Sequence, residues 1–111
     1  DVNFSGIPEL IIPRRQQNST HVFHQYTLKV LPKLRNPLIK FLNKNSIPVM
    51  IYYPVPLYKQ KAFNNYVNSN FKIANIEYLC SSVFSLPIHT EVKSSNQDFI
   101  INKVKDFFNE L

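Results

Sequence analysis

The stretch that decides the fold of this chain is Ile47-Pro48-Val49-Met50-Ile51-Tyr52-Tyr53-Pro54-Val55-Pro56-Leu57-Tyr58-Lys59-Gln60. Its first part is an apolar run of the length of a buried strand, which predicts a strand from Val49 to Tyr53. Because a prolyl nitrogen cannot donate to a strand ladder, Pro54 and Pro56 force the chain out of the sheet. The two tyrosines lie at this exit, where the strand ends and a loop begins. Ligand-binding residues are common at such positions. A core strand with a purely structural turn is the alternative.

On the N-terminal side, His21–Leu31 alternates as a half-covered strand does. The alternation predicts Val22, His24, Tyr26, Leu28 and Val30 on the covered face, with His24 as a satisfied core histidine. Asn36 and Pro37 form a helix start, with Asn as N-cap and Pro at the first helical position. We expect this helix to end near Asn45–Ser46, with Asn45 in the left-handed conformation.

On the C-terminal side, apolar residues at helical spacing predict a helix over residues 73–82, and Val83–Ile88 a strand. Cys80 lies on that helix's apolar stripe and is expected to be buried and inert. Ser95 is the expected cap of a final helix, whose apolar stripe is Ile100, Val104, Phe107, Phe108 and Leu111. The predicted fold class is therefore α/β (α+β), a small, mostly antiparallel three-stranded sheet with helices packed on one side.

Composition and length bound the class of protein. The chain has 111 residues, of which 44% are hydrophobic and 14% aromatic, so we expect one folded domain. The net charge of +6 is scattered, with Arg14–Arg15 as the one adjacent basic pair. Scattered charge is typical of a solvated surface rather than an anion-binding groove. Residues 1–4 are neither basic nor apolar enough for a leader, and Cys80 is the single cysteine. These features predict a cytoplasmic protein without membrane spans.

Residues for catalysis are scarce. His21, His24 and His89 are dispersed, and no cysteine pair supports a metal site, so no metal is expected. One glycine in the whole chain cannot build a Gly-rich phosphate loop.

Three blocks carry a resemblance to a known family. Residues 52–60 resemble the His-Tyr-Pro-x-Pro-Leu-His-x-Gln signature in the C-terminal part of DegT/DnrJ/StrS aminotransferases, which use pyridoxal phosphate on nucleotide-linked sugars. Residues 21–28 resemble the strand before that signature, and Ser85–His89 the Leu-Ser-Leu-Pro block after it. The three blocks follow the family's order over roughly residues 19–111.

The resemblance implies a C-terminal small domain over residues 21–111, preceded by a connector, residues 1–20, from a missing N-terminal large domain. The Schiff-base lysine and the other cofactor contacts of the family belong to that large domain, so this chain is expected to hold no catalytic and no cofactor-binding residue. Alone it should not transaminate. Tyr52, Tyr53, Tyr58 and His24 are the implied substrate-binding residues, with Tyr52 and Tyr58 where the family commonly has histidine. The implied partners are the large domain, a second subunit in a homodimer and a nucleotide sugar, in amino-sugar or surface-polysaccharide synthesis.

Two alternatives to this enzyme fragment stay open at this point. The first is a free-standing basic module that binds or regulates without catalysis and recruits an anionic partner. The second is a structural piece whose apolar patch pairs two copies. The patch formed by Ile7, Leu10, Ile11 and Ile12 packs either on its own domain or on a part of the protein absent here.

Overall fold

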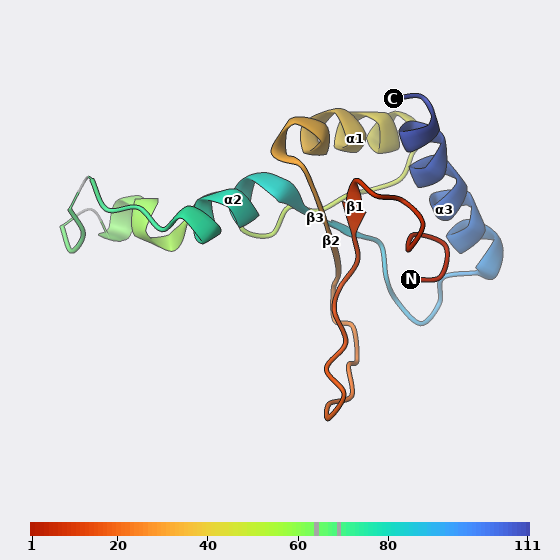
Figure 1. The fold of residues 1–111 in the computed structure, drawn as a ribbon, viewed down its shortest axis with the longest axis horizontal. Coiled ribbons are helices and arrows are strands. Elements are labelled where there is room, and N and C mark those ends of the chain that lie inside the picture. Colours follow the sequence, from red (N-terminus) through yellow and green to blue (C-terminus); the bar gives the residue numbers. More distant parts are fainter. Residues whose placement is uncertain (64, 69) are drawn as a thin grey trace.

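The computed structural model describes residues 1–63, 65–68 and 70–111, which fold around one small antiparallel sheet (Figure 1). Its elements are β1 (Leu10–Ile11), β2 (Tyr26–Val30), α1 (Pro32–Lys44), the 3₁₀ turns η1 (Leu57–Lys59) and η2 (Lys61–Phe63), α2 (Ala74–Ser82), β3 (Val83–Leu86) and α3 (Ser94–Asn109). The predicted fold class, a three-stranded antiparallel sheet with helices, is confirmed. No helix among the described residues is long and apolar enough to cross a membrane.

The strand order is β1-β2-β3, so β2 is central. Leu10 lies opposite Val30, and Leu28 opposite Phe84, and all four side chains are buried. On the other face, Thr27 Oγ1 and Ser85 Oγ lie 2.8 Å apart and share a hydrogen bond. The alternation in the sequence thus predicted the covered face of the last part of β2 correctly, because directly opposed residues of an antiparallel pair share a face.

The third strand is not the predicted one. In residues 49–53 only Met50 pairs with the sheet, in a bridge to Ser85 whose two N–H···O distances are 3.1 and 2.8 Å. In this register Pro48 lies opposite Pro87, and because neither proline has an N–H, the pairing cannot extend in that direction. The third strand is β1, from the segment expected to be a connector. Phe4 and Leu10 of that segment are buried in the core, so its apolar patch packs on its own domain. The role of residues 1–20 as a connector stays a prediction.

β2 begins at Tyr26, not at His21 as predicted. Phe23 has a φ of 49°, which takes the backbone out of the extended region and breaks the alternation. Val22 is consequently 91% exposed, and His24 is exposed as well, although the pattern predicted both on the covered face.

α1 begins five residues earlier than predicted. Pro32 takes the first helical position and Pro37 lies inside the helix, where its missing N–H leaves one intrahelical bond unmade. At the other end, the left-handed residue is Ser46, with a φ of 61°. Asn45 keeps a φ of −92° and uses its side-chain Nδ2 to donate to the Phe41 carbonyl at 2.9 Å. The predicted roles of Asn36 and Asn45 are therefore wrong.

α1 and α3 supply the helical half of the core. Its fully buried apolar side chains come from β2, α1, β3 and α3 and are Leu28, Val30, Leu38, Leu42, Phe84 and Val104. α3 begins at Ser94 after Lys93, which makes no side-chain cap bond, so the predicted Ser95 cap is wrong. Val104 and Phe107 are buried on the predicted stripe, while Leu111 at its end is exposed.

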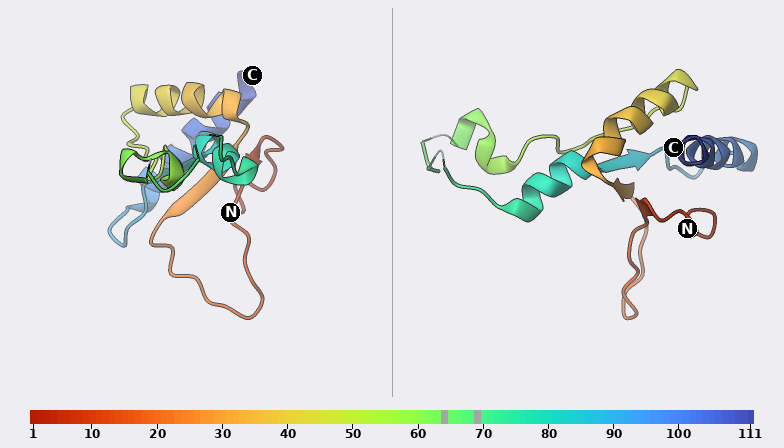
Figure 2. Two further views of the ribbon diagram at one scale, coloured as in Figure 1. Left: turned by 90° about the vertical axis from the view of Figure 1, so that its left-hand side faces the viewer. Right: turned by 45° about the horizontal axis from the view of Figure 1, so that its top comes forward.

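α2 agrees with the predicted helix to within one residue, but its surroundings do not agree with the prediction. Figures 1 and 2 show η1, η2 and α2, which we call the arm, extending away from the sheet and from α3. The Cα radius of gyration is 16.0 Å, whereas a compact domain of this length has about 13 Å. The apolar stripe of α2 is largely exposed, and Cys80 is half-buried rather than buried.

Candidate functional site

Tyr53 lies where the sequence predicts it, at the exit from the sheet. After the bridge at Met50, the chain runs through Tyr52 and Tyr53 into the Pro54–Pro56 turn. Tyr53 is 74% exposed, and its hydroxyl makes no hydrogen bond within the described residues. Tyr52 beside it is also exposed. A tyrosine that is this open contributes little to the core, so its side chain is available for a ligand.

Tyr53 and His24 line the same cavity, although they come from segments on opposite sides of α1 in the sequence. The cavity is shallow and open, has a volume of about 450 Å³, and is completed by Pro13, His21, Phe23, Gln25 and Thr27. The structure therefore brings two of the four predicted site residues together. Tyr52 and Tyr58 do not line this cavity.

The loop before β2 is braced by its own aromatic and basic side chains. The Phe23 N–H donates to His21 Nδ1 at 2.9 Å, and the two rings stack with centroids 4.1 Å apart. The Arg15 guanidinium lies over the Phe23 ring, 4.0 Å from its centroid. These contacts hold the left-handed backbone at Phe23, and it is this turn that releases His24 from the sheet face. No sequence pattern indicates a left-handed phenylalanine.

Tyr58 is occupied by contacts within the chain. Its hydroxyl donates to Glu77 Oε1 at 2.8 Å and accepts from the Ile73 N–H at 3.2 Å. Lys59 Nζ lies 2.7 Å from the same carboxylate oxygen. The hydrogen bond from Lys59, and after it the one from Tyr58, lowers the pKa of Glu77, and the same contact raises the pKa of Lys59. Tyr58 thus joins η1 to the start of α2, and its predicted contact with substrate stays a prediction.

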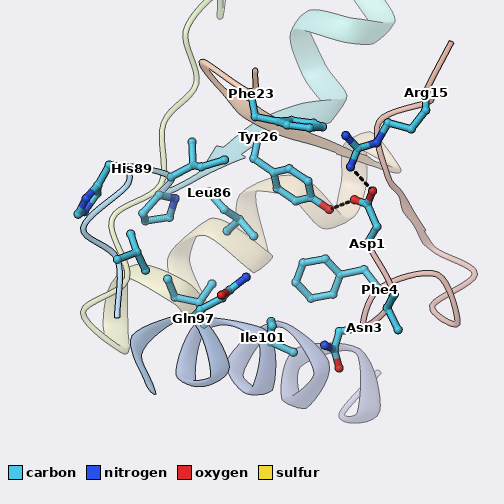
Figure 3. A pocket seen from close by; sticks show the side chains of 15 residues that line it. Asp1, Asn3, Phe4, Arg15, Phe23, Tyr26, Leu86, His89, Gln97 and Ile101 are labelled. Carbon is cyan, nitrogen blue, oxygen red and sulfur yellow. Dashed lines mark hydrogen bonds and ion pairs between the residues drawn. The ribbon is translucent and has the colours of Figure 1, made fainter. Parts of the chain in front are cut away.

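A second, larger cavity of about 530 Å³ lies between the N-terminal segment, the end of the sheet and α3 (Figure 3). At its rim, the Tyr26 hydroxyl donates to Asp1 Oδ1 at 2.6 Å, and Arg15 forms an ion pair with the same carboxylate. Burial raises the pKa of Tyr26, while the nearby Arg15 charge lowers it. These polar groups satisfy one another, and the other walls are mostly apolar. None of the four predicted site residues lines this cavity.

Several solved aminotransferase structures share this fold. S. venezuelae DesV, solved in complex with a ketimine intermediate, superposes with a TM-score of 0.90 over 99% of this chain and 29% of its own, at 21% identity. An aminotransferase from Brucella abortus superposes with a TM-score of 0.84 at 26% identity, over 96% of this chain and 28% of its own.

Sequence comparison gives the family. The profile of the DegT/DnrJ/EryC1/StrS aminotransferase family matches residues 1–105, and the chain belongs to this family. It is 32% identical over 99 residues to a pleiotropic regulatory protein of Geobacillus stearothermophilus, covering 89% of this chain. It is 28% identical over 100 residues, 90% of this chain, to dTDP-3-amino-3,6-dideoxy-alpha-D-galactopyranose transaminase of Aneurinibacillus thermoaerophilus. The chain spans only 26% of the length of each relative.

The resemblance implies pyridoxal phosphate as cofactor, and the expectation that residues 1–111 do not hold it stays a prediction. A Schiff-base lysine needs a desolvated site beside the cofactor. Neither of the two cavities described above is lined by a lysine, and nor is a further one between Asn45 and Phe99. Lys59 and Lys103 form ion pairs with Glu77 and Asp106.

Proposed function

We propose that residues 21–111 are the C-terminal small domain of a pyridoxal-phosphate-dependent sugar aminotransferase, and that they line the substrate side of its active site. The observation that carries this proposal is the cavity shared by Tyr53 and His24. Residues 1–20 would connect this domain to a large N-terminal domain, which would hold the cofactor and the reacting lysine. A protein with such a large second domain would agree with the finding that this chain spans about a quarter of its relatives' length.

The chemistry of the cavity suits a sugar. A phenol, an imidazole and the amide of Gln25 offer both donors and acceptors, which is what neutral hydroxyl groups require. Two relatives are named as aminotransferases of nucleotide-linked sugars, one of a dTDP sugar and one of a UDP sugar. We infer that the substrate here is a nucleotide-linked keto sugar and that the whole protein acts as a homodimer in the cytoplasm, in amino-sugar or surface-polysaccharide synthesis.

The experiment uses the longer protein that carries this chain, with Tyr53→Phe as the variant. Removing the exposed hydroxyl should leave the melting temperature unchanged, because the hydroxyl has no partner among the described residues. It should lower kcat/KM for the sugar by a free energy of roughly 1–3 kcal/mol, the cost of an unpaired polar partner in the transition state. Tyr66→Phe, at another exposed tyrosine of the chain, is the matched control.

The opposite result would assign Tyr53 to the fold. In that case the melting temperature of Tyr53→Phe would fall while kcat/KM per folded molecule stayed at the wild-type value. His24→Gln, at the other side of the cavity, should reduce kcat/KM in the same direction if both residues contact the sugar.

A further inference from the structure

The apolar stripe of α2 is an unusual feature, because it has the spacing of a buried helix face but is not buried. Ile76 and Leu79 lie three residues apart on one side of α2, and Ile73, three residues before Ile76, is the N-cap residue of the helix. Ile73, Ile76 and Leu79 are 39%, 36% and 45% exposed. Leu57 of η1, which is joined to α2 through Tyr58, is exposed as well. Contiguous apolar surface of this kind marks interaction sites.

The arm keeps its shape without burying this stripe. At its start, the hydroxyl of Tyr58 and the amine of Lys59 hold the carboxylate of Glu77, the residue after Ile76. At its end, the Arg35 side chain of α1 donates to the carbonyl oxygen of Cys80. The stripe is therefore presented by a helix that is fixed at both ends. Such a preformed surface costs less ordering entropy when a partner binds.

We propose that the exposed stripe of α2 is the docking face for a part of the longer polypeptide that lies outside residues 1–111. This inference rests on the proposed function, which makes the chain one domain of a larger protein. The solved structure of S. venezuelae DesV superposes on 99% of this chain, arm included, and is more than three times as long, so polypeptide is available to cover the stripe.

The charges around the stripe define the chemistry of that partner. Lys59 and Lys61 lie in η1 and η2, and Lys72 lies just before α2, against one carboxylate, Glu77. The docking partner therefore has an apolar centre that receives Ile73, Ile76 and Leu79 and a rim that carries Asp or Glu. A second copy of this arm does not fit, because it would set lysines against lysines on chains that each carry a net charge of +6.

Site-specific crosslinking in the longer protein tests the proposal. A photoreactive benzoylphenylalanine replaces Ile76, and the same residue at Ala74 serves as control, since Ala74 lies on another side of α2. We expect the probe at position 76 to crosslink to an apolar peptide with acidic neighbours from outside residues 1–111, and the probe at position 74 to give much less of this product.

Three outcomes would overturn the proposal: a crosslink from position 76 to a peptide within residues 1–111, a crosslink to a basic peptide, or no product beyond that of position 74. A stability measurement complements the crosslink. Ile76→Asp should lower the melting temperature of the longer protein, whereas Ala74→Asp adds the same charge and should leave it unchanged. Equal melting temperatures of the two variants would contradict the docking. Neither measurement depends on turnover, so unaltered kinetics of Tyr53→Phe would overturn the proposed substrate role and leave this result standing.

Discussion

The hydroxyl of Tyr58 donates a 2.8 Å hydrogen bond to Glu77 Oε1, and this bond joins η1 to α2. The same hydroxyl accepts the N–H of Ile73, one of the amides at the start of α2 that have no partner within the helix. Tyr58 therefore acts as a cap from outside the helix, and the arm depends on it.

Replacing Tyr58 by Phe should loosen the arm while leaving the core folded. The ring would still pack edge-on against Phe71, whose centroid lies 5.3 Å away, but the Ile73 amide would lose its acceptor. We expect the hydrogen exchange of the first amides of α2 to become several-fold faster, with the amides of β2 unchanged. Tyr66→Phe, at an exposed tyrosine, should change neither. Equal exchange in the Tyr58→Phe variant and the wild type would contradict this role.

The contact between Lys59 and Glu77 predicts a pH dependence of the arm. The pKa of Glu77 is lowered from 4.5, first by the hydrogen bond from Lys59 and then by that from Tyr58. A lowered folded-state pKa stabilises the arm above pH 4.5, and this contribution is lost as the pH falls through the folded-state value. The pKa of Lys59 is raised from 10.5, so its contribution is present below that pH and is lost as the pH rises through the raised value.

Amide exchange of α2, corrected for its intrinsic pH dependence, measures this effect. Protection should be constant around neutral pH and should decrease below pH 4.5. Glu77→Gln should remove the acidic decrease, since no carboxylate remains to be protonated. An acidic decrease that persists unchanged in Glu77→Gln would show that another group controls the arm.

The break of the β2 alternation at Phe23 can be tested with two truncations. Leu28→Ala removes a side chain with 0% exposure and should cost about 2–5 kcal/mol of unfolding free energy. Val22→Ala, at a position the alternation alone would bury, should change stability by only about 0.5 kcal/mol or less. Urea unfolding of both variants measures the difference. A large loss in Val22→Ala would mean that the strand extends to His21 after all.

Residues 1–111 mixed with pyridoxal phosphate and then treated with borohydride should yield no stoichiometric adduct at a single lysine. The reason is that no lysine lines the cavity of Tyr53 and His24, the cavity at Asp1 and Tyr26, or the one between Asn45 and Phe99. Intact mass and peptide mapping are the measurements, and the longer protein under the same treatment is the positive control. A one-to-one adduct at one lysine of this chain would contradict the assignment of the cofactor to the remaining part of the protein.

The candidate site shows how far sequence patterns reach. The position of Tyr53 at the exit from the sheet could be predicted, because a strand-like run followed by two prolines takes the chain out of a sheet whatever surrounds it. The neighbours of Tyr53 in the cavity could not. His24 reaches the cavity only because Phe23 adopts a left-handed conformation, and this conformation is held by contacts with His21 and Arg15. Contacts of Phe23 with a residue two positions before it and another eight positions before it leave no periodic signal in the sequence.

By itself, the sequence determined the family and the elements whose signals are local: the apolar spacing of α2 and α3, the strand β3, and the covered face at Leu28 and Val30. The tertiary structure alone decided which segment became the third strand. The run at residues 49–53 has the stronger strand composition, yet only Met50 in it pairs with the sheet, through a bridge to Ser85, and the two residues of β1 form the third strand. It also decided that the stripe of α2 stays open, because periodicity shows which side of a helix is apolar and only the arrangement of the other elements determines whether that side is covered.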